Sequence, residues 1–175
     1  LATSSAASDV YKRQAVILGT GVGAGYSVNK KIIVGPNKLT GEWGQNPIPG
    51  PMDEYEKSVK RHCGRVGAVE VFLSGPGLEN YYEHITKTKI SSRDIVSLYR
   101  ENDLVAGEVM DVYFERIARS FSTFVNILDP DVIVCGGGMS EIDEIYDEVP
   151  NRIIPYIASN FFLTPIVKAT HGSSS

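Results

Sequence analysis

The sequence predicts an α/β domain with a single core, and three patterns carry that prediction. A glycine-rich run, residues 19–25, joins one apolar strand-like segment to another. A long amphipathic helix is expected between Asp103 and Asp129, and a buried apolar strand, residues 131–135, follows it and ends in three glycines. Strands that alternate with helices and end in glycine turns are typical of α/β folds.

The composition favours a soluble protein. The 175 residues are 42% hydrophobic, which is enough to bury one core and makes one domain the default. The net charge is −4 and the Lys and Arg residues are scattered, which argues against a nucleic-acid surface. No apolar run approaches the ~20 residues of a membrane span, and no secretion signal opens the chain. Two distant cysteines, Cys63 and Cys135, indicate a reducing compartment, so we expect a cytoplasmic protein without membrane or nucleic-acid partners.

The first 14 residues give no sign of the strand that follows them. Residues 4–14 resemble a translated sequencing-adapter artefact, and the run before them has no periodicity. We therefore expect residues 1–14 to be a non-native leader and base the fold on residues 15–175, as is done for other non-native segments. On this interpretation the natural protein continues upstream of Ala15 and the chain is a fragment.

The glycine-rich run follows the apolar residues 15–18 and leads into a hairpin. Residues 26–28 and 32–34 are short β-branched segments separated by the polar turn 29–31. Alternating glycines leave backbone amides bare, so they can hold a phosphate, with the hydroxyl of Thr20 in reach. A dinucleotide fingerprint is the competing interpretation, but it needs a helix directly after the loop. A glycine-rich hairpin without a ligand is the remaining alternative.

Residues 41–51 contain too many Gly and Pro for a helix and carry an acid, an aromatic ring and two amides: Glu42, Trp43, Gln45 and Asn46. Planar polar groups beside an aromatic wall are suited to sugar hydroxyls. The alternative is a solvated loop held by a buried tryptophan. Glu70 begins or lies just inside a short helix, where its carboxylate either reaches a ligand or only interacts with the helix dipole.

The second half of the chain alternates helix and strand. Residues 91–94 cap a helix that runs through Tyr99. Asp103 caps the longest helix, whose apolar residues recur at intervals of three and four and form a core stripe: Val105, Val109, Val112, Ile117, Phe121, Phe124, Val125 and Leu128.

A second glycine turn follows the strand 131–135. A helix is expected to open at Ser140, so that strand, glycine turn and helix N-terminus form another anion- or nucleotide-binding arrangement. We expect Pro150 to divide the helical stretch that comes next, and residues 164–169 to form the last strand.

Four motifs in order carry a resemblance to a known family: residues 19–25, 41–47, 63–70 and 126–138. Together they resemble the C-terminal domain of the ROK family of repressors, uncharacterised frames and sugar kinases, and most of all its bacterial fructokinases, whose loop reads Gly-Glu-Trp-Gly-His-Asn-Pro. The resemblance implies an actin-like ATPase (ribonuclease H-like) fold, a mixed sheet flanked by helices. Residues 15–175 would then be the C-terminal half of a two-domain kinase, truncated at both ends.

The resemblance implies ATP-dependent phosphorylation of a hexose, with fructose favoured and Mg accompanying ATP. The ATP phosphates would be held by Gly19, Thr20, Gly21, Val22, Gly23, Ala24 and Gly25, and the adenosine side by Gly136, Gly137 and Gly138. The sugar would contact Glu42, Gln45, Asn46 and Glu70. In the family, the catalytic Asp and a first phosphate loop lie in an N-terminal domain. This sequence contains neither, so we assign no catalytic residue and expect the chain alone to be inactive.

Many members of the family hold zinc with one His and three Cys. In this sequence those positions are Gln45, Arg61, Cys63 and Ala68. Structural zinc is bound by four N or S ligands, of which only Cys63 remains, so we expect zinc binding to be lost. The alternatives are an N-acetylglucosamine, mannose or glucose kinase of the same family, a sugar-responsive ROK repressor, or a decayed fragment. The intact glycine loop favours a kinase. Relatives commonly dimerise, so a homodimer is a candidate assembly, although no residue here demonstrates it.

Overall fold

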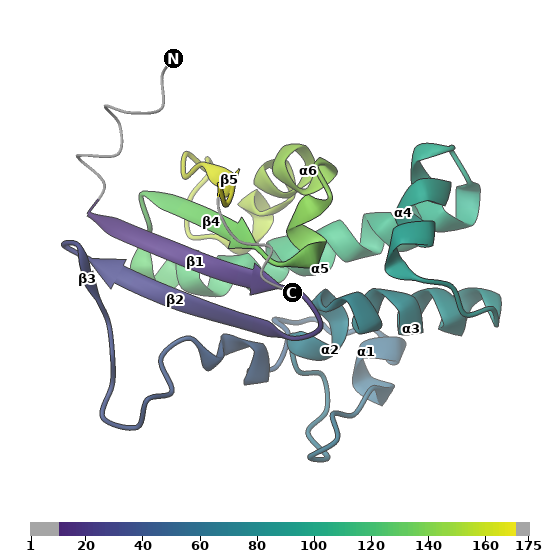
Figure 1. Ribbon diagram of the computed structural model, residues 1–175, viewed down its shortest axis with the longest axis horizontal. Coiled ribbons are helices and arrows are strands. Elements are labelled where there is room, and N and C mark those ends of the chain that lie inside the picture. The colour runs from purple at the N-terminus through teal and green to yellow at the C-terminus, as the bar shows by residue number, and fades with distance from the viewer. Residues whose placement is uncertain (1–10, 171–175) are drawn as a thin grey trace.

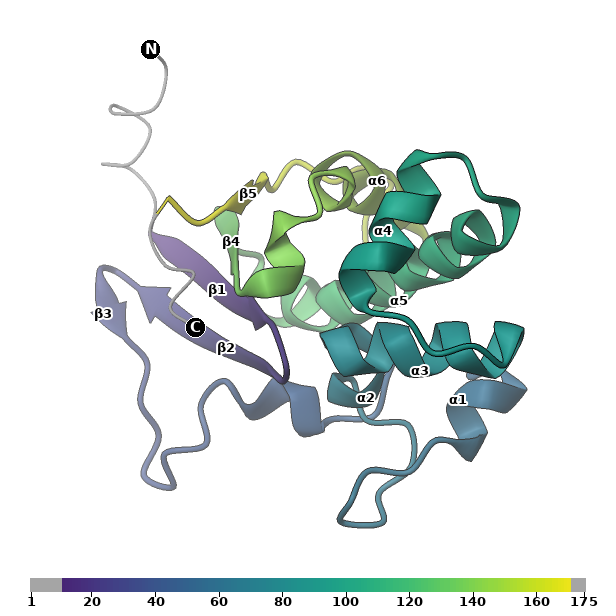
Figure 2. The same ribbon diagram turned by 45° about the vertical axis from the view of Figure 1, so that its right-hand side comes forward.

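The computed structural model describes residues 11–170, which form a mixed five-stranded sheet with helices packed beside it (Figure 1, Figure 2). The strand order is β3-β2-β1-β4-β5. The first three strands, β1 (Lys12–Leu18), β2 (Val22–Val28) and β3 (Lys31–Ile32), are antiparallel neighbours. Two later strands, β4 (Val132–Gly136) and β5 (Ile166–Lys168), extend the sheet parallel to β1. The mixed α/β sheet, the hairpin and the last strand are therefore confirmed.

Strand β1 begins earlier than we expected. Lys12 pairs with Val28 of β2, and Gln14 pairs with Ile133 of β4 and is fully buried. Residues 12–14 thus belong to the sheet, although we expected them to be part of a non-native leader, residues 1–14. Residues 1–10 of that expected leader lie outside the described residues. The sequence of residues 12–14 did not indicate a strand, because all three residues are polar and only one of their side chains, that of Gln14, is buried. Buried and exposed side chains alternate along the rest of β1, as a sheet with one covered face requires.

Helix α5 (Leu104–Leu128) lies alongside the sheet and supplies much of the core (Figure 1). Its N-cap is Asp103, whose carboxylate accepts a hydrogen bond from the Ala106 amide at 2.8 Å. The predicted stripe is confirmed, since most of its members are buried in one cluster with β1 and β4. The buried Trp43 packs edge-to-face on Phe121 and Phe124, with ring centroids 6.0 and 5.4 Å away.

Trp43 belongs to a short 3-10 helix, η1 (Glu42–Gln45), where the Gly and Pro content predicted no helix. The other helical elements are α1 (Glu54–Ser58), α2 (Glu70–Leu73), α3 (Gly75–Thr86), α4 (Ser92–Arg100), η2 (Gly138–Glu141), α6 (Glu144–Arg152) and η3 (Ile154–Tyr156).

The predicted cap of α4 is confirmed, because Ser91 and Asp94 form a capping box. Two expectations near the C-terminus are wrong. The predicted helix start at Ser140 lies in η2, and α6 begins only at Glu144. Helix α6 continues through Pro150 to Arg152. The proline lacks the amide that would donate to the Tyr146 carbonyl, but helical hydrogen bonding resumes beyond it, since the Ile153 amide donates to the Val149 carbonyl at 3.0 Å.

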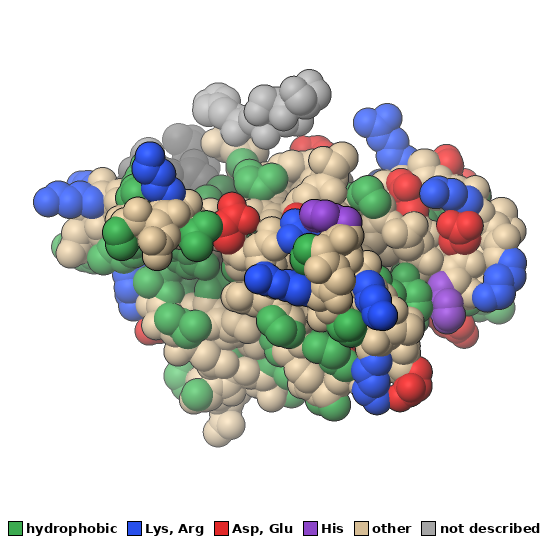
Figure 3. Space-filling view, turned by 90° about the horizontal axis from the view of Figure 1, so that it is seen from below, with side chains coloured by type: hydrophobic (Ala, Val, Ile, Leu, Met, Phe, Trp, Pro, Cys, Tyr) green, Lys and Arg blue, Asp and Glu red, His purple; other side chains and the backbone are tan. Residues whose placement is uncertain are grey.

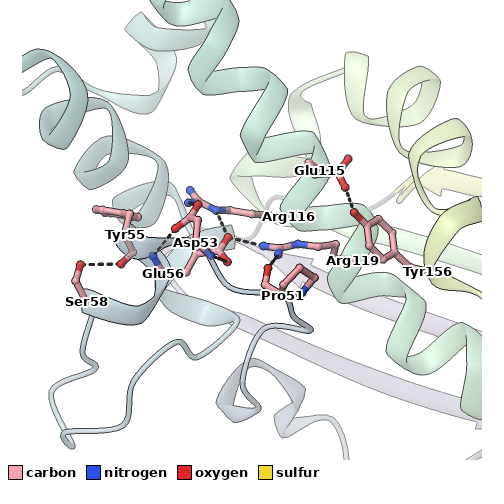
Figure 4. Close-up of polar contacts among 9 residues, drawn as sticks. All are labelled: Pro51, Asp53, Tyr55, Glu56, Ser58, Glu115, Arg116, Arg119 and Tyr156. Atoms are coloured by element: carbon pink, nitrogen blue, oxygen red, sulfur yellow. Dashed lines mark hydrogen bonds and ion pairs between the residues drawn. The ribbon is translucent and has the colours of Figure 1, made fainter.

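A buried ion cluster joins α1 to α5 (Figure 4). The Glu56 carboxylate, 1% exposed, accepts a 2.8 Å hydrogen bond from Nε of Arg116 and another from Nη2 of Arg119. The Arg116 guanidinium also reaches Asp53 at 3.3 Å and lies over the Tyr81 ring, 4.1 Å from its centroid. These contacts fix the start of the 53–70 segment against the core.

On the face shown in Figure 3, Lys and Arg side chains are scattered among acidic and uncharged ones. None of the helices in the described part of the chain is both long enough and apolar enough to span a bilayer.

Candidate functional site

A tight glycine turn connects β1 to β2. The Gly19 amide donates to the carbonyl of Gly21 at 3.0 Å, and the Gly75 amide at the start of α3 donates to the carbonyl of Gly19 at 2.9 Å. The turn is shorter than the predicted loop 19–25, because residues 22–25 already pair with β1 as part of β2. The Ala24 amide donates to Gly41 at 2.8 Å and is therefore not free to bind an anion.

A cleft of 1310 Å³ opens beside this turn. Its wall includes Gly19, Thr20, Gly21 and Gly23 from the first glycine segment, and Gly137 and Gly138 from the second. The two glycine segments meet at this cleft, whereas four of the predicted nucleotide-binding residues are not among its lining residues: Val22, Ala24, Gly25 and Gly136.

Gly137 explains how the two segments come so close. Its φ is +88°, and a Cβ there would lie 2.4 Å from the carbonyl oxygen of Leu18, at the end of β1. Only glycine allows the turn after β4 to approach β1 in this way, so the residue type fixes the geometry of the cleft.

The cleft also has a wall that the sequence did not reveal. The helices α3 and α4 contribute Gly75, Pro76, Glu79, Ser92, Arg93, Val96, Ser97 and Arg100. Arg100 is paired with Glu144, Nε to Oε1 at 2.7 Å, whereas Arg93 forms no ion pair with any residue in the described range. The capping box shows that α4 exists, but no local pattern says which cleft the helix faces.

The segment with the predicted sugar ligands packs on the other side of β2. A Cβ at Gly44 of η1 would lie 2.4 Å from the carbonyl oxygen of Val22, so η1 rests directly on the strand backbone. The chain after η1 then pairs with the chain before α2. The Val69 amide donates to the backbone carbonyl of Asn46 at 2.9 Å, and the Ile48 amide donates to the backbone carbonyl of Gly67 at 2.7 Å. This pairing brings Gln45 close to Glu70, which begins α2 as predicted.

A continuous chain of polar contacts runs from η1 to the glycine turn. Nε2 of Gln45 lies 3.5 Å from Oε2 of Glu42, and Oε1 of Gln45 accepts a hydrogen bond from Nη1 of Arg61. Nε of Arg61 donates to Oε1 of Glu70 at 3.0 Å. Partial burial lowers the pKa of Arg61, but the hydrogen bond and charge of Glu70 outweigh it and raise that pKa above its usual range.

The chain of contacts ends at the turn. Oε2 of Glu70 accepts from the Val22 amide at 3.5 Å, and a Cβ at Gly21 would lie 3.2 Å from the same oxygen. A separate pocket of 660 Å³ contains Glu42, Gln45 and Asn46 together with Tyr26, Leu39, Gly41, Trp43 and Arg65. Three of the four predicted sugar ligands therefore share one pocket, and Glu70 is joined to them through Arg61.

The residues present suit a nucleotide better than zinc. A Cβ at Gly23 or Gly138 would meet nothing within 4 Å, so bare backbone faces open space in the cleft. Among the four positions at which the resemblance implied zinc ligands, Arg61 places a guanidinium between Gln45 and Glu70, and Ala68 offers only a buried methyl group. A cation held at this point would be repelled by Arg61, so the donor set does not fit the metal.

The mixed sheet with its flanking helices has the actin-like ATPase fold. The family model of the ROK family matches residues 2–175, and the chain belongs to this family. An N-acetyl-D-glucosamine kinase of Vibrio atlanticus is 35% identical to it over 163 residues, which cover 91% of this chain and 54% of that protein. The chain thus spans about half the length of the curated relatives it matches.

Two solved structures show the same fold. A ROK hexokinase from Thermus thermophilus aligns with a TM-score of 0.81 at 19% identity, over 95% of this chain and 54% of the other. A ROK family glucokinase from Streptomyces griseus, in complex with glucose and AMPPNP, aligns with a TM-score of 0.77 at 18% identity, over 91% of this chain and 56% of the other. These likenesses confirm the fold that the four motifs predicted.

Proposed function

We propose that this chain is the C-terminal domain of an ATP-dependent hexose kinase. One observation carries the proposal: the turn Gly19–Gly21 lines the large cleft and also adjoins the Glu70 carboxylate. A glycine turn that a phosphate can approach closely thus lies next to a carboxylate suited to sugar hydroxyls. Phosphoryl transfer asks a protein chiefly for alignment and charge stabilisation, which such an arrangement supplies.

In this proposal each side of the turn has its own ligand. ATP with Mg would occupy the cleft, held by the turn and by Gly137 and Gly138, with the lining residue Arg93, which has no ion pair within residues 11–170, as a cation for the phosphates. The sugar would lie against Glu42, Gln45, Asn46 and Glu70. By the family resemblance, the proton acceptor for the sugar hydroxyl would come from an N-terminal domain. ATP use and the two free cysteines, Cys63 and Cys135, support a cytoplasmic location.

The identity of the hexose rests on two different arguments. The loop Trp43-Gly44-Gln45-Asn46-Pro47 favours fructose, by its likeness to the fructokinase motif. The curated relatives at about one-third identity support N-acetylglucosamine. Gln45 departs from the fructokinase motif, which has His at this position: an amide can hydrogen-bond a hydroxyl but cannot carry the charge of an imidazole.

The test is a kinase assay on the full-length protein that contains this chain, with fructose, N-acetylglucosamine, mannose and glucose in parallel. We expect ATP-dependent turnover of at least one sugar. Glu42→Gln should lower kcat/KM for that sugar by on the order of 10-fold, because a charged hydrogen-bond acceptor is lost. KM for ATP should stay within about twofold, since Glu42 is absent from the cleft lining.

The matched control is Glu101→Gln, which removes an exposed carboxylate at the end of α4 that lines neither pocket. We expect it to behave like the wild type. Failure of the wild-type protein to phosphorylate any of the four sugars would overturn the kinase proposal.

A further inference from the structure

Arg61 occupies a position between the two groups that the proposed sugar site needs most. Its guanidinium donates from Nε to Glu70 at 3.0 Å and from Nη1 to Gln45. The side chains of Arg61 and Glu70 are only 16% and 25% exposed. Their ion pair is therefore less screened than one on an open surface.

The backbone around Arg61 is fixed independently of these contacts. Lys60 and Val66 form an antiparallel bridge, and the Arg61 amide donates to the Arg65 carbonyl at 2.8 Å. The Gly64 amide closes the loop by donating to the Arg61 carbonyl at 2.8 Å. The Arg61 side chain thus leaves from the base of a closed loop, so backbone contacts set the direction of its Cα–Cβ bond.

This placement decides which end of the Gln45 amide faces the pocket. A glutamine amide has one acceptor end and one donor end. Because Arg61 has donors only, it engages the oxygen and turns Nε2 towards Oε2 of Glu42, 3.5 Å away. The pocket then presents an acceptor from Glu42 beside a donor from Gln45, the pairing that a sugar hydroxyl satisfies by donating to one and accepting from the other.

We propose that Arg61 is a positioning residue for sugar recognition, which fixes Gln45 as a hydrogen-bond donor and holds Glu70 beside the glycine turn. The sugar part of this inference rests on the proposed function. The same guanidinium links η1 to α2 by hydrogen bonds and charge, so that connection requires no metal ion. A Lys at this position would keep the charge but could not engage both partners with one planar fork.

The experiment compares Arg61→Met, Arg61→Lys and Gln45→Glu in the full-length protein, with the better substrate of the sugar panel. Arg61→Met should raise KM for the sugar about 10- to 100-fold, the cost of a lost charged hydrogen bond, and leave KM for ATP within about twofold. Arg61→Lys should restore part of the loss. Gln45→Glu should impair sugar use as strongly, because its carboxylate can still pair with Arg61 but cannot donate.

Lys60→Met is the matched control, because it removes the neighbouring exposed cation, and its sugar KM should not change. A second readout needs no substrate. The side-chain amide signals of Gln45 in a 1H–15N spectrum, identified by their loss in Gln45→Glu, should shift in Arg61→Met and stay in place in Lys60→Met.

The outcomes separate the two proposals. Unchanged Gln45 signals in Arg61→Met would overturn the positioning role even if the enzyme is an active kinase. An equal loss of sugar and ATP use in Arg61→Met would likewise overturn it, since that pattern indicates general damage. A wild-type protein without turnover, but with the expected shift of the Gln45 signals, would overturn the proposed function and with it the sugar role, and would leave only the structural link.

Discussion

At the scale of single residues, the two cysteines have opposite environments. Cys63 is exposed, and a hydrogen bond from the backbone of Arg65, together with the charges of Arg61 and Arg65, lowers the pKa of its thiol. Cys135 lies fully buried in β4, where burial raises its pKa to about 12. Because the thiolate is the reactive form, the two residues should differ sharply in alkylation.

We expect one thiol per folded chain to react with iodoacetamide, and both to react after unfolding. The rate for Cys63 should rise with pH around a midpoint below the ordinary thiol pKa of about 8.5. Mass spectrometry of the alkylated peptides identifies the site. Labelling of Cys135 in the folded protein, or a Cys63 midpoint at or above the ordinary value, would contradict this assignment.

At the scale of the elements, η1 depends on a close approach of two backbones. Gly44→Ala would place a Cβ 2.4 Å from the Val22 carbonyl oxygen, so η1 must move away from β2. We expect a loss of about 1–3 kcal/mol in the free energy of unfolding, as for other overpacked sites. Denaturant titration measures the loss.

Gly107→Ala is the matched control for this substitution. Gly107 lies inside α5, where an added Cβ meets nothing within 4 Å, so alanine should stabilise the helix by about 0.5–1 kcal/mol. Equal stability of the Gly44→Ala protein and the wild type would show that η1 does not rest on β2 as described.

The elements also show what sequence patterns can and cannot predict. Helix α5 and strand β4 were predictable because dense apolar periodicity encodes them locally. Helix α3 was missed because it opens with Gly75-Pro76-Gly77, although proline in a first turn is compatible with a helix and Ser74 caps it. Helix α1 was missed because its short charged run owes its burial to contacts with α5, far along the chain.

The candidate site was likewise predictable from the sequence only in part. The glycine turns and the two carboxylates were recognisable as motifs. The structure places Glu70 beside the first glycine turn and Glu42 in the separate pocket of η1. The position of Arg61 in sequence indicated only the loss of a zinc ligand. Its contact with Gln45, 16 residues away, depends on the pairing of residues 46–48 with 67–69, which no local pattern encodes. The sequence did not indicate that Arg93 lines the cleft for a related reason: it predicts helix α4 but not which side of the helix faces the cleft.

At the scale of the whole molecule, the large cleft is built from residues between Ile17 and Ile142, so its geometry requires most of the domain to be folded. The ion cluster of Figure 4 joins α1 to the central helix α5 and therefore supports the segment that leads to Arg61 and Glu70. Charges buried this deeply contribute little net stability when paired, but breaking the pair is costly.

Glu56→Gln tests this cluster with almost no change in shape. Within residues 11–170, it leaves the Arg116 and Arg119 guanidinium groups, 2% and 7% exposed, with only the half-exposed Asp53 carboxylate as a charged partner. We expect the free energy of unfolding to fall by about 3–5 kcal/mol. Glu54→Gln, in the same helix, removes an exposed carboxylate that pairs with Lys57 at 2.6 Å, and should lower the free energy of unfolding far less, because water screens this pair. Added salt should erase the small effect and barely alter the large one, because only the Lys57 pair is open to solvent. Similar losses in the two variants, measured by denaturant unfolding, would mean that the cluster does not support the domain.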